Sequence, residues 1–299
     1  MSVWPSPTRP TRSWMFVPGN KDRFLIKASQ SEADCVFLDL EDGVSVAHKS
    51  TARQMVARVL EGPWPGPIRF VRVNSIGSPW WKDDVEAAVR PGLDGVCLPK
   101  VERSDEIEML DARLGRLEAE RGLPAGSVRI VGAIESAKGL LSAPQIGGAS
   151  ARMVGLMFGA EDYALDLGLG TAREGEAGEL SYHRSSLVVA AAAAGVLSID
   201  GVFPSLEDPR GLVRDVAQAR RLGFSGKSTF NPRQLKEINR MFTPSSEERA
   251  YAQRVVEAFE EAQQRGDASV AVGGQLVDLP IVMRARRVLD VDGPADGRP

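Results

Sequence analysis

The 299-residue chain has few of the residues that form disulfides or bind soft metals, with only two cysteines and two histidines. Cys35 and Cys97 each lie inside an apolar run, where a buried free thiol is the expected state. Because no disulfide framework can form, the protein is expected in the cytoplasm. Zinc is disfavoured, because the sequence has no HExxH or CxxC motif and places His48 and His183 outside the expected strand ends.

Long apolar runs and an excess of one charge are also absent. No run reaches the roughly 18 apolar residues that a membrane helix needs, and residues 1–14 have prolines and arginines where a signal peptide has an apolar stretch. Lys and Arg number 37 against 40 Asp and Glu, a formal net charge of -3. That balance gives no electrostatic basis for binding nucleic acid or an acidic membrane surface, so the expected partner is a small molecule.

Short apolar segments bounded by glycine, proline or charge alternate with segments of helical period, such as 105–120, 181–194 and 209–222. Strands that alternate with helices pair in parallel, and about eight such units predict a (β/α)8 TIM barrel of the α/β class, with a doubly wound sheet as the alternative. The predicted strands are Ser13 to Val17, Cys35 to Leu40, Ile68 to Val73, Gly95 to Leu98, Val128 to Ile134, Val154 to Phe158, Ile199 to Phe203 and Gly226 to Phe230.

The barrel is expected to span residues 1–242, followed by a C-terminal helical extension over 243–299. In the extension we expect a helix over 246–265 opened by the cap-like TPSSEE, a turn at Gly273 and Gly274, and a helix over 279–289. Residues 168–179 are rich in glycine and charge, which predicts a mobile loop that either closes over a substrate or is an ordinary surface loop. The segment DVDGPADGRP at 290–299 is expected to be disordered.

Polar residues gather at the predicted strand ends, which share one mouth in a barrel. For any single residue of this kind, an equally good explanation of its charge is that the strand reaches solvent at that point. The set as a whole indicates a catalytic mouth, because its carboxylates come from several strands and are accompanied by cations. The set comprises the Pro18–Lys21 segment, Asp39, Glu41, Asp42, Arg72, Asn74, Lys100, Glu135, Ser136, Glu161, Asp162, Ser205 and Asn231.

Two consecutive apolar segments end abruptly in carboxylates, at Glu135 and at Glu161 with Asp162. Carboxylates from adjacent strands favour a hard cation held by oxygen ligands, and Mg²⁺ accepts one or two of them together with waters and substrate oxygens. Glu135 and Asp162 are the predicted ligands. If the chain is still extended there, Glu161 and Asp162 point to opposite sides, so only one faces the mouth.

Six motifs resemble, in order, the citrate lyase β-subunit-like proteins of the HpcH/HpaI aldolase group, which includes malyl-CoA and citramalyl-CoA lyases. The resemblance implies a Mg²⁺-dependent barrel enzyme that makes or breaks a carbon–carbon bond between a 2-oxo acid and the acetyl carbon of a thioester. It also implies a homo-oligomer, trimeric or hexameric. The motifs are FVPGN at 16–20, FLDLEDGV at 37–44, RVN at 72–74, LPKVE at 98–102, AIES at 133–136 and FGAEDYALDLG at 158–168.

The same resemblance implies residue roles. Glu135 and Asp162 would bind Mg²⁺, Arg72 would contact the substrate oxygens, and Lys21 would contact CoA or substrate. Asp278 matches an acid that in some relatives reaches a neighbouring subunit's site, where it could move the proton at the acetyl carbon. An aspartate before a helix is also an ordinary cap.

Three further residues are assigned with alternatives. Glu41 is expected to hold Arg72 in place or to form a rim salt bridge, and Lys100 to meet a carboxylate or a CoA phosphate. Asn231 stands in GKSTFNPRQ where relatives often have histidine, so the resemblance does not fix its contact with substrate. Asn231 before Pro232 still suits a helix N-cap.

The preferred function is a lyase for malyl-, citramalyl- or citryl-CoA, acting in either direction. One alternative is a CoA-independent aldolase for 2-oxo acids. The other is the β subunit of a multi-subunit citrate lyase that works on an acyl carrier protein thioester.

Overall fold

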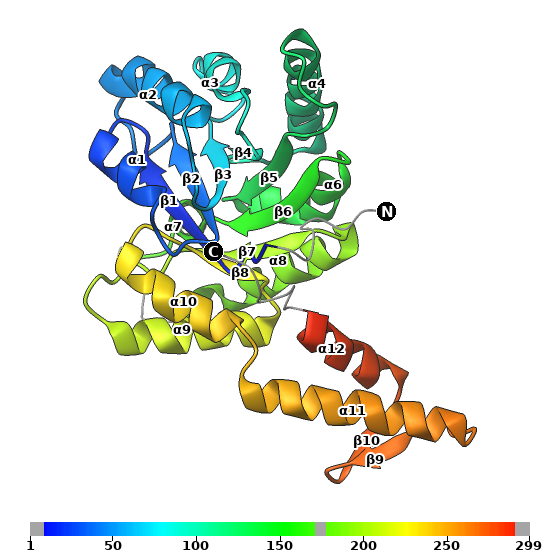
Figure 1. Ribbon diagram of the computed structural model, residues 1–299. Coiled ribbons are helices and arrows are strands. Elements are labelled where there is room, and N and C mark those ends of the chain that lie inside the picture. Colours follow the sequence, from blue (N-terminus) through cyan, green and yellow to red (C-terminus); the bar gives the residue numbers. More distant parts are fainter. Residues whose placement is uncertain (1–8, 171–177, 291–299) are drawn as a thin grey trace. The chain divides into compact units, whose positions relative to one another are not determined.

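A computed structural model describes residues 9–170 and 178–290, and in it eight parallel strands close into a barrel in the order β1 to β8 (Figure 1). Closure is completed by pairing of the first strand with the eighth. The predicted (β/α)8 barrel is confirmed, and the doubly wound sheet is excluded. The strands are β1 (Ser13–Pro18), β2 (Cys35–Asp39), β3 (Ile68–Arg72), β4 (Gly95–Leu98), β5 (Arg129–Ile134), β6 (Met153–Phe158), β7 (Leu197–Asp200) and β8 (Gly226–Thr229).

Helices follow the strands as expected of βα units, and three predicted helices match closely. These are α4 (Ser104–Glu120), α8 (Ser181–Ala194) and α9 (Pro209–Leu222). The remaining helices of this part of the chain are α1 (Asp22–Ala28), α2 (Lys49–Glu61), α3 (Trp81–Ala88), α5 (Ala137–Leu141), α6 (Ala143–Gly148), α7 (Ala160–Asp166) and α10 (Leu235–Phe242).

Aromatic side chains from β1, β2 and β3 pack against one another inside the barrel. The Trp14 ring lies 5.1 Å from Phe37 on the next strand and 5.2 Å from Phe70 two strands away, which requires all three to point inward. Because side chains alternate along a strand, Asp39 and Arg72 follow Phe37 and Phe70 on the same inner face. They are register partners of β2 and β3, so their side chains meet at the mouth.

Strand β7 begins and ends earlier than predicted, over Leu197–Asp200 rather than Ile199 to Phe203. The chain leaves the sheet after Asp200, whose carboxylate accepts hydrogen bonds from Lys227 on β8 and from Arg184 on α8. Lys227 Nζ also binds the Gly201 carbonyl oxygen at 2.6 Å, which fixes the turn. Val202 and Phe203, which follow Gly201, are buried but do not pair with a neighbouring strand. In the sequence, this apolar pair has the pattern of a buried strand.

The described chain divides into two compact units, one over Thr11–Arg240 and one that holds residues 241–290 together with Arg9 and Pro10. The second unit contains α11 (Ser246–Gln264), the antiparallel strands β9 (Val270–Val272) and β10 (Gln275–Val277), and α12 (Leu279–Asp290).

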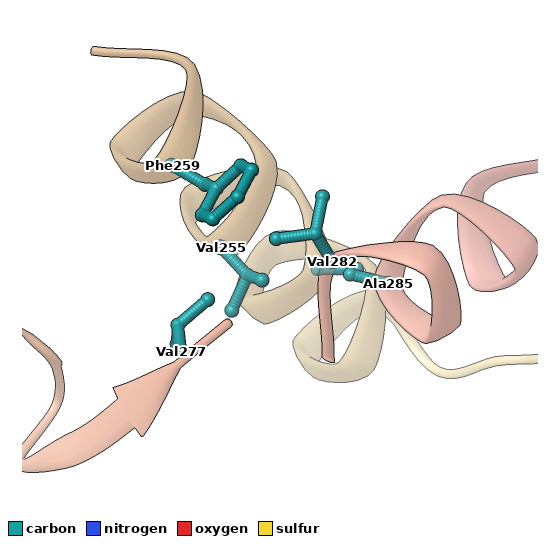
Figure 2. Packing of buried hydrophobic residues seen from close by; sticks show 6 residues of the cluster. Val255, Phe259, Val277, Val282 and Ala285 are labelled. Atoms are coloured by element: carbon teal, nitrogen blue, oxygen red, sulfur yellow. The ribbon is translucent and has the colours of Figure 1, made fainter. Parts of the chain in front are cut away.

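The fold of the second unit follows its sequence signals. Ser245 and Glu248 form the expected capping box of α11, and Gly273 and Gly274, both with positive φ, make the hairpin turn. Its small core joins both helices and β10, and Figure 2 shows Phe259, Val277 and Val282 directed toward one another.

Two sequence expectations fall mainly outside the described residues. Of the loop expected over 168–179, residues 171–177 are not described, and Gly178–Leu180 form a short 3₁₀ helix rather than loop. The expected disorder at 290–299 concerns almost only undescribed residues. Within the ranges that the structure describes, no helix has the length and apolar character of a membrane span.

Candidate active site at the barrel mouth

Arg72, at the end of β3, is held rigidly by two acids. Its Nε and Nη2 donate to Asp39 Oδ1 and Oδ2 at 2.8 and 2.7 Å, and Nη1 lies 3.1 Å from Glu41 Oε2. Its guanidinium also lies 4.5 Å above the Phe16 ring. Burial alone would lower the pKa of Arg72, but attraction by Asp39 outweighs it and raises the pKa, so the side chain is a permanent, oriented cation.

Asp39 is wrapped by the loop that follows β2. Its two oxygens accept hydrogen bonds from the Glu41 and Gly43 amides, both at 2.9 Å. A Cβ on Gly43 would lie 2.3 Å from Asp39 Oδ2, so only glycine lets the loop close on the carboxylate. The loop that carries Glu41 is therefore built around the carboxylate that orients Arg72.

Lys49, the first residue of α2, holds the same loop from the other side. It is buried, and its Nζ donates to the Leu40 and Glu41 carbonyl oxygens at 2.7 Å and to Asn74 Oδ1 at 2.8 Å. Burial lowers the pKa of Lys49 against the attraction of nearby acids. Asn74 Nδ2 donates in turn to Leu40 O and to Asp84, which ties the ends of β2 and β3 to α3.

Glu135, which follows β5, is buried to 95% and carries a carboxylate oxygen, Oε2, without a hydrogen-bond partner in the described structure. Burial, reinforced by repulsion from Glu41, raises the pKa of Glu135 to about 8. The side chain crosses the end of β6 at Gly159, where a Cβ would lie 2.3 Å from Glu135 Cγ. Glycine at 159 therefore makes room for this carboxylate.

Asp162 and Glu161 lie in the first turn of α7 rather than in an extended strand, because β6 ends at Phe158 and Gly159 separates it from the helix. The alternation expected for an extended chain does not apply to them. Both acids line the same small cavity as Glu135. Asp162 Oδ1 also lies 3.9 Å from Lys100 Nζ, which itself donates to Glu41 Oε1 at 2.7 Å.

The cavity, of about 60 Å³, lies at the ends of several strands and has Arg72, Glu135 and Asp162 in its lining. Within the described residues no three acid, histidine or cysteine side chains form a preformed metal cage. Mg²⁺ does not need one, because it keeps several waters and takes only one or two carboxylates. Glu135 Oε2 is buried without a hydrogen-bond partner in the described structure and lies in the same cavity lining as Asp162, so the donor set fits a hard divalent cation.

The other predicted residues are placed as follows. Lys21 is exposed at the N-terminus of α1, directly after β1. Asn231 follows β8 and caps the next turn, with Oδ1 accepting from the Arg233 amide at 3.1 Å, so the capping expectation is confirmed. Asp278 precedes α12, where its backbone carbonyl accepts from the Ile281 and Val282 amides and its side-chain Oδ1 accepts from the Ile281 amide at 3.4 Å, as expected of a helix cap. The catalytic and substrate roles of these residues stay predictions.

Sequence reasoning placed Glu41 beside Arg72, and their ion pair is present. It missed Asp39 as the main partner of Arg72, although period two along FLD and FVR puts both on inner faces. It also missed Lys49 and Phe16, since neither a lysine that begins a helix nor a strand phenylalanine has a distinguishing motif.

The closed barrel has an oriented arginine and the buried carboxylate of Glu135 together at the carboxyl ends of its strands, which is where (β/α)8 enzymes carry their active sites. The particular group follows from comparison with known proteins. Residues 12–232 match the model of the HpcH/HpaI aldolase/citrate lyase family, and the chain belongs to that family. The resemblance inferred from the motifs is thus confirmed, and with it the expectation of a lyase family.

Named relatives cover nearly the whole chain. Citrate lyase subunit beta of Leuconostoc mesenteroides subsp. cremoris is 40% identical over 93% of this chain and 92% of its own. A (3S)-malyl-CoA thioesterase of Cereibacter sphaeroides is 33% identical, over 94% of both chains. The solved structure of the protein CitE from Mycobacterium tuberculosis, in complex with magnesium, acetoacetate and coenzyme A, is 29% identical with a TM-score of 0.77, over 96% of this chain and 99% of that one.

Proposed function

We propose that this protein is a Mg²⁺-dependent carbon–carbon lyase that cleaves, or in reverse forms, a 3-hydroxyacyl-CoA to give acetyl-CoA and a 2-oxo acid. The observation that carries the proposal is the buried carboxylate of Glu135, whose pKa of about 8 and unpartnered oxygen mark a place for a cation beside Arg72. Glu135 and Asp162 are the proposed ligands. A bound divalent cation would supply the positive charge that makes a substrate hydroxyl acidic near neutral pH.

The other roles in the reaction belong to residues of the chain. Arg72, fixed by Asp39 and Glu41, binds oxygens of the oxo acid and stabilises the charge that moves onto them. The hydroxyl proton passes to solvent water, and the hydroxyl oxygen becomes the carbonyl oxygen of the 2-oxo acid. At the same time the bond between the hydroxyl-bearing carbon and the thioester α-carbon breaks, and its electron pair goes to the α-carbon. Protonation of that carbon gives the acetyl thioester, and Asp278 is the proposed acid.

Two assignments extend this proposal to the assembly. Asp278 is proposed to act in the site of a neighbouring subunit, which makes the active form a homo-oligomer, a trimer or hexamer. Lys21 and Asn231 are proposed to contact the thioester and the oxo acid. The named M. tuberculosis structure supports the ligand classes, since it holds magnesium, acetoacetate and coenzyme A. A cytoplasmic location is part of the same proposal.

The test is to incubate purified protein with malyl-, citramalyl- and citryl-CoA and Mg²⁺, and to detect acetyl-CoA and the 2-oxo acid by mass spectrometry. Release of free CoA from an intact carbon chain, as a thioesterase would give, overturns the lyase. Reaction of free hydroxy-oxo acids alone indicates the CoA-independent aldolase. Turnover that needs an acyl carrier protein partner indicates the β subunit of a citrate lyase.

The metal assignment is tested separately by calorimetric titration of Mg²⁺. Glu135→Gln and Asp162→Asn should each weaken binding by at least about tenfold, because each removes a charged ligand. Glu257→Gln on α11 makes the same chemical change at an exposed position and should bind as wild type. Wild-type affinity in both site variants contradicts the assignment.

The shared site is tested by mixing two inactive variants. Asp278→Asn and Glu135→Gln, dissociated and reassembled together, should regain part of the activity if each site takes Asp278 from a neighbour. No recovery in mixed oligomers contradicts the assignment of Asp278 to a neighbouring site.

A further inference from the structure

The cavity at the barrel mouth has two chemically different sides. Arg72 and the three carboxylates of Glu135, Glu161 and Asp162 make up the charged part of its lining. The remaining side chains of the lining are almost all apolar, and they include Phe16, Met157, Val202 and Phe230. A substrate in this cavity therefore meets charge on one part of its surface and hydrocarbon on another.

Phe230 and Phe16 make the apolar side continuous from Arg72 to the mouth. The two rings lie 5.0 Å apart, and Phe16 itself lies under the Arg72 guanidinium at 4.5 Å. Phe230 is 57% exposed, although it is a large apolar side chain at the end of a barrel strand. A small apolar group bound in the cavity would cover part of this ring and remove its surface from water.

Cations are scarce around this apolar side. Arg72 is the only cation among the described residues of the lining. Two other ammonium groups at the strand ends are already engaged, Lys100 by Glu41 and Asp42 and Lys227 by Asp200 and Asp215. Lys21 lies outside the cavity lining and is assigned above to the thioester. One carboxylate of a 2-oxo acid can be matched by Arg72 and by a cation at Glu135. A second carboxylate would face Phe16 and Phe230 without a counter-charge and would lose part of its hydration there, whereas an alkyl group would gain from the same contact.

We infer that the 2-oxo acid handled by this site is a monocarboxylate with a small alkyl substituent, such as pyruvate or 2-oxobutyrate, and that Phe230 selects it. The inference rests on the proposed function and names the substrate class of the same site. The thioester cleaved is then a 3-alkyl-3-hydroxyacyl-CoA such as citramalyl-CoA. Citryl-CoA, which releases the dicarboxylate oxaloacetate, and malyl-CoA, which releases glyoxylate without an alkyl group, are disfavoured.

The test measures kcat/KM for citramalyl-, malyl- and citryl-CoA, and in parallel the binding of pyruvate, glyoxylate and oxaloacetate by calorimetry with Mg²⁺ present. The wild type should prefer the pyruvate series over the glyoxylate series by about tenfold, the usual effect of one methyl group. The preference over the oxaloacetate series should be larger. A wild-type preference for either of the other two series overturns the inference.

Two variants make the assignment to Phe230 specific. Phe230→Ser should remove most of the preference for the methyl group. Phe230→Arg should shift the ratio of citryl-CoA to citramalyl-CoA cleavage toward citryl-CoA by about tenfold or more, mainly through KM, because it places a cation on the apolar side. Phe24→Arg changes a phenylalanine of similar exposure on α1, outside the cavity lining, and should keep the wild-type ratios.

The two parallel readouts separate this inference from the proposed function. If no thioester is cleaved but pyruvate binds more tightly than oxaloacetate and Phe230→Arg reverses that order, the lyase proposal fails and the selectivity inference holds. If thioesters are cleaved with unchanged ratios in both Phe230 variants, the lyase proposal holds and the role of Phe230 is refuted.

Discussion

Lys100 Nζ lies 2.7 Å from Glu41 Oε1, and the backbone of Lys100 has a φ of 55°. Over the residues that the structure describes, Lys100 is the only non-glycine residue with positive φ. This left-handed conformation brings the chain out of β4 and turns the lysine toward β2. A strained backbone of this kind is retained where it places a side chain in a functional contact. Here it places Lys100 against Glu41, which also pairs with Arg72.

The strain at Lys100 should be measurable. Lys100→Gly and Lys100→Ala both remove the ammonium, but only glycine relieves the left-handed conformation. The glycine variant should therefore be more stable than the alanine variant by about 1 kcal/mol in denaturant unfolding. At Lys236, an exposed position inside α10, the same pair should rank in the opposite order, because glycine weakens a helix. Equal ranking at both positions contradicts the strain.

Gly159 should be required for the carboxylate site. In Gly159→Ala the new Cβ would overlap Glu135 Cγ and Cδ, so Glu135 must move. Mg²⁺ affinity measured by calorimetry should fall by about tenfold or more. Gly148→Ala adds the same methyl group where nothing lies within 4 Å, and it should leave affinity unchanged. Unchanged affinity in Gly159→Ala would mean that Glu135 is not held in the orientation that the structure shows.

The metal-free protein should lose stability as the pH rises. The pKa of Glu135 is raised from 4.5 to about 8, so between these values the folded protein keeps a proton that the unfolded chain releases. The free energy of unfolding should then fall with rising pH, by at most about 1.4 kcal/mol per pH unit from this group. Denaturant unfolding in EDTA from pH 5.5 to 9 measures the slope.

Two comparisons assign the slope to Glu135. Glu135→Gln removes the titrating group and should flatten the profile, whereas Glu257→Gln should retain the wild-type slope. Mg²⁺ should also flatten it for wild type, because a cation favours the ionised carboxylate and lowers its pKa. A wild-type slope in Glu135→Gln contradicts the assignment.

The barrel could be predicted from the sequence because each βα unit carries its own local signals, namely a short apolar run, a turn and a helical period. Strand ends were less predictable. Burial continues past Asp200 into Val202 and Phe203, and the sequence does not show that a buried ion network ends β7 before them. A local sequence pattern indicates which residues are buried, whereas the end of a strand depends on hydrogen bonds to other elements.

At the site, the sequence identified the mouth residues but not their pairing. Period two places Asp39 and Arg72 on inner faces, yet their contact depends on the register of β2 against β3. Register is a tertiary property, so Glu41 was chosen as the partner of Arg72 and Asp39 was overlooked. The helical position of Asp162 was not predicted for a related reason. Gly159, which lies between β6 and α7, permits either a continued strand or the start of a helix.

Lys49 should position Glu41 and, through the loop around Asp39, Arg72. Lys49→Met keeps the aliphatic stem and removes the three hydrogen bonds that hold Leu40, Glu41 and Asn74. Leu40 O keeps a donor in Asn74 and Glu41 O keeps one in the Val44 amide, but the buried Asn74 Oδ1 loses the donor that Lys49 supplies. We therefore expect a loss of about 2 kcal/mol in the free energy of unfolding. Lys27→Met, at an exposed position of α1, should cost far less.

Stability alone does not distinguish positioning from packing, so kinetics on the folded Lys49→Met protein are needed. A loosened loop lets Arg72 sample unproductive orientations, which lowers kcat more than it raises KM, because the charge on Arg72 still attracts the substrate. We expect kcat to fall by about tenfold or more with KM changed by less, after correction for the folded fraction. A variant that is destabilised but has the kcat of wild type would show that Lys49 only supports the fold.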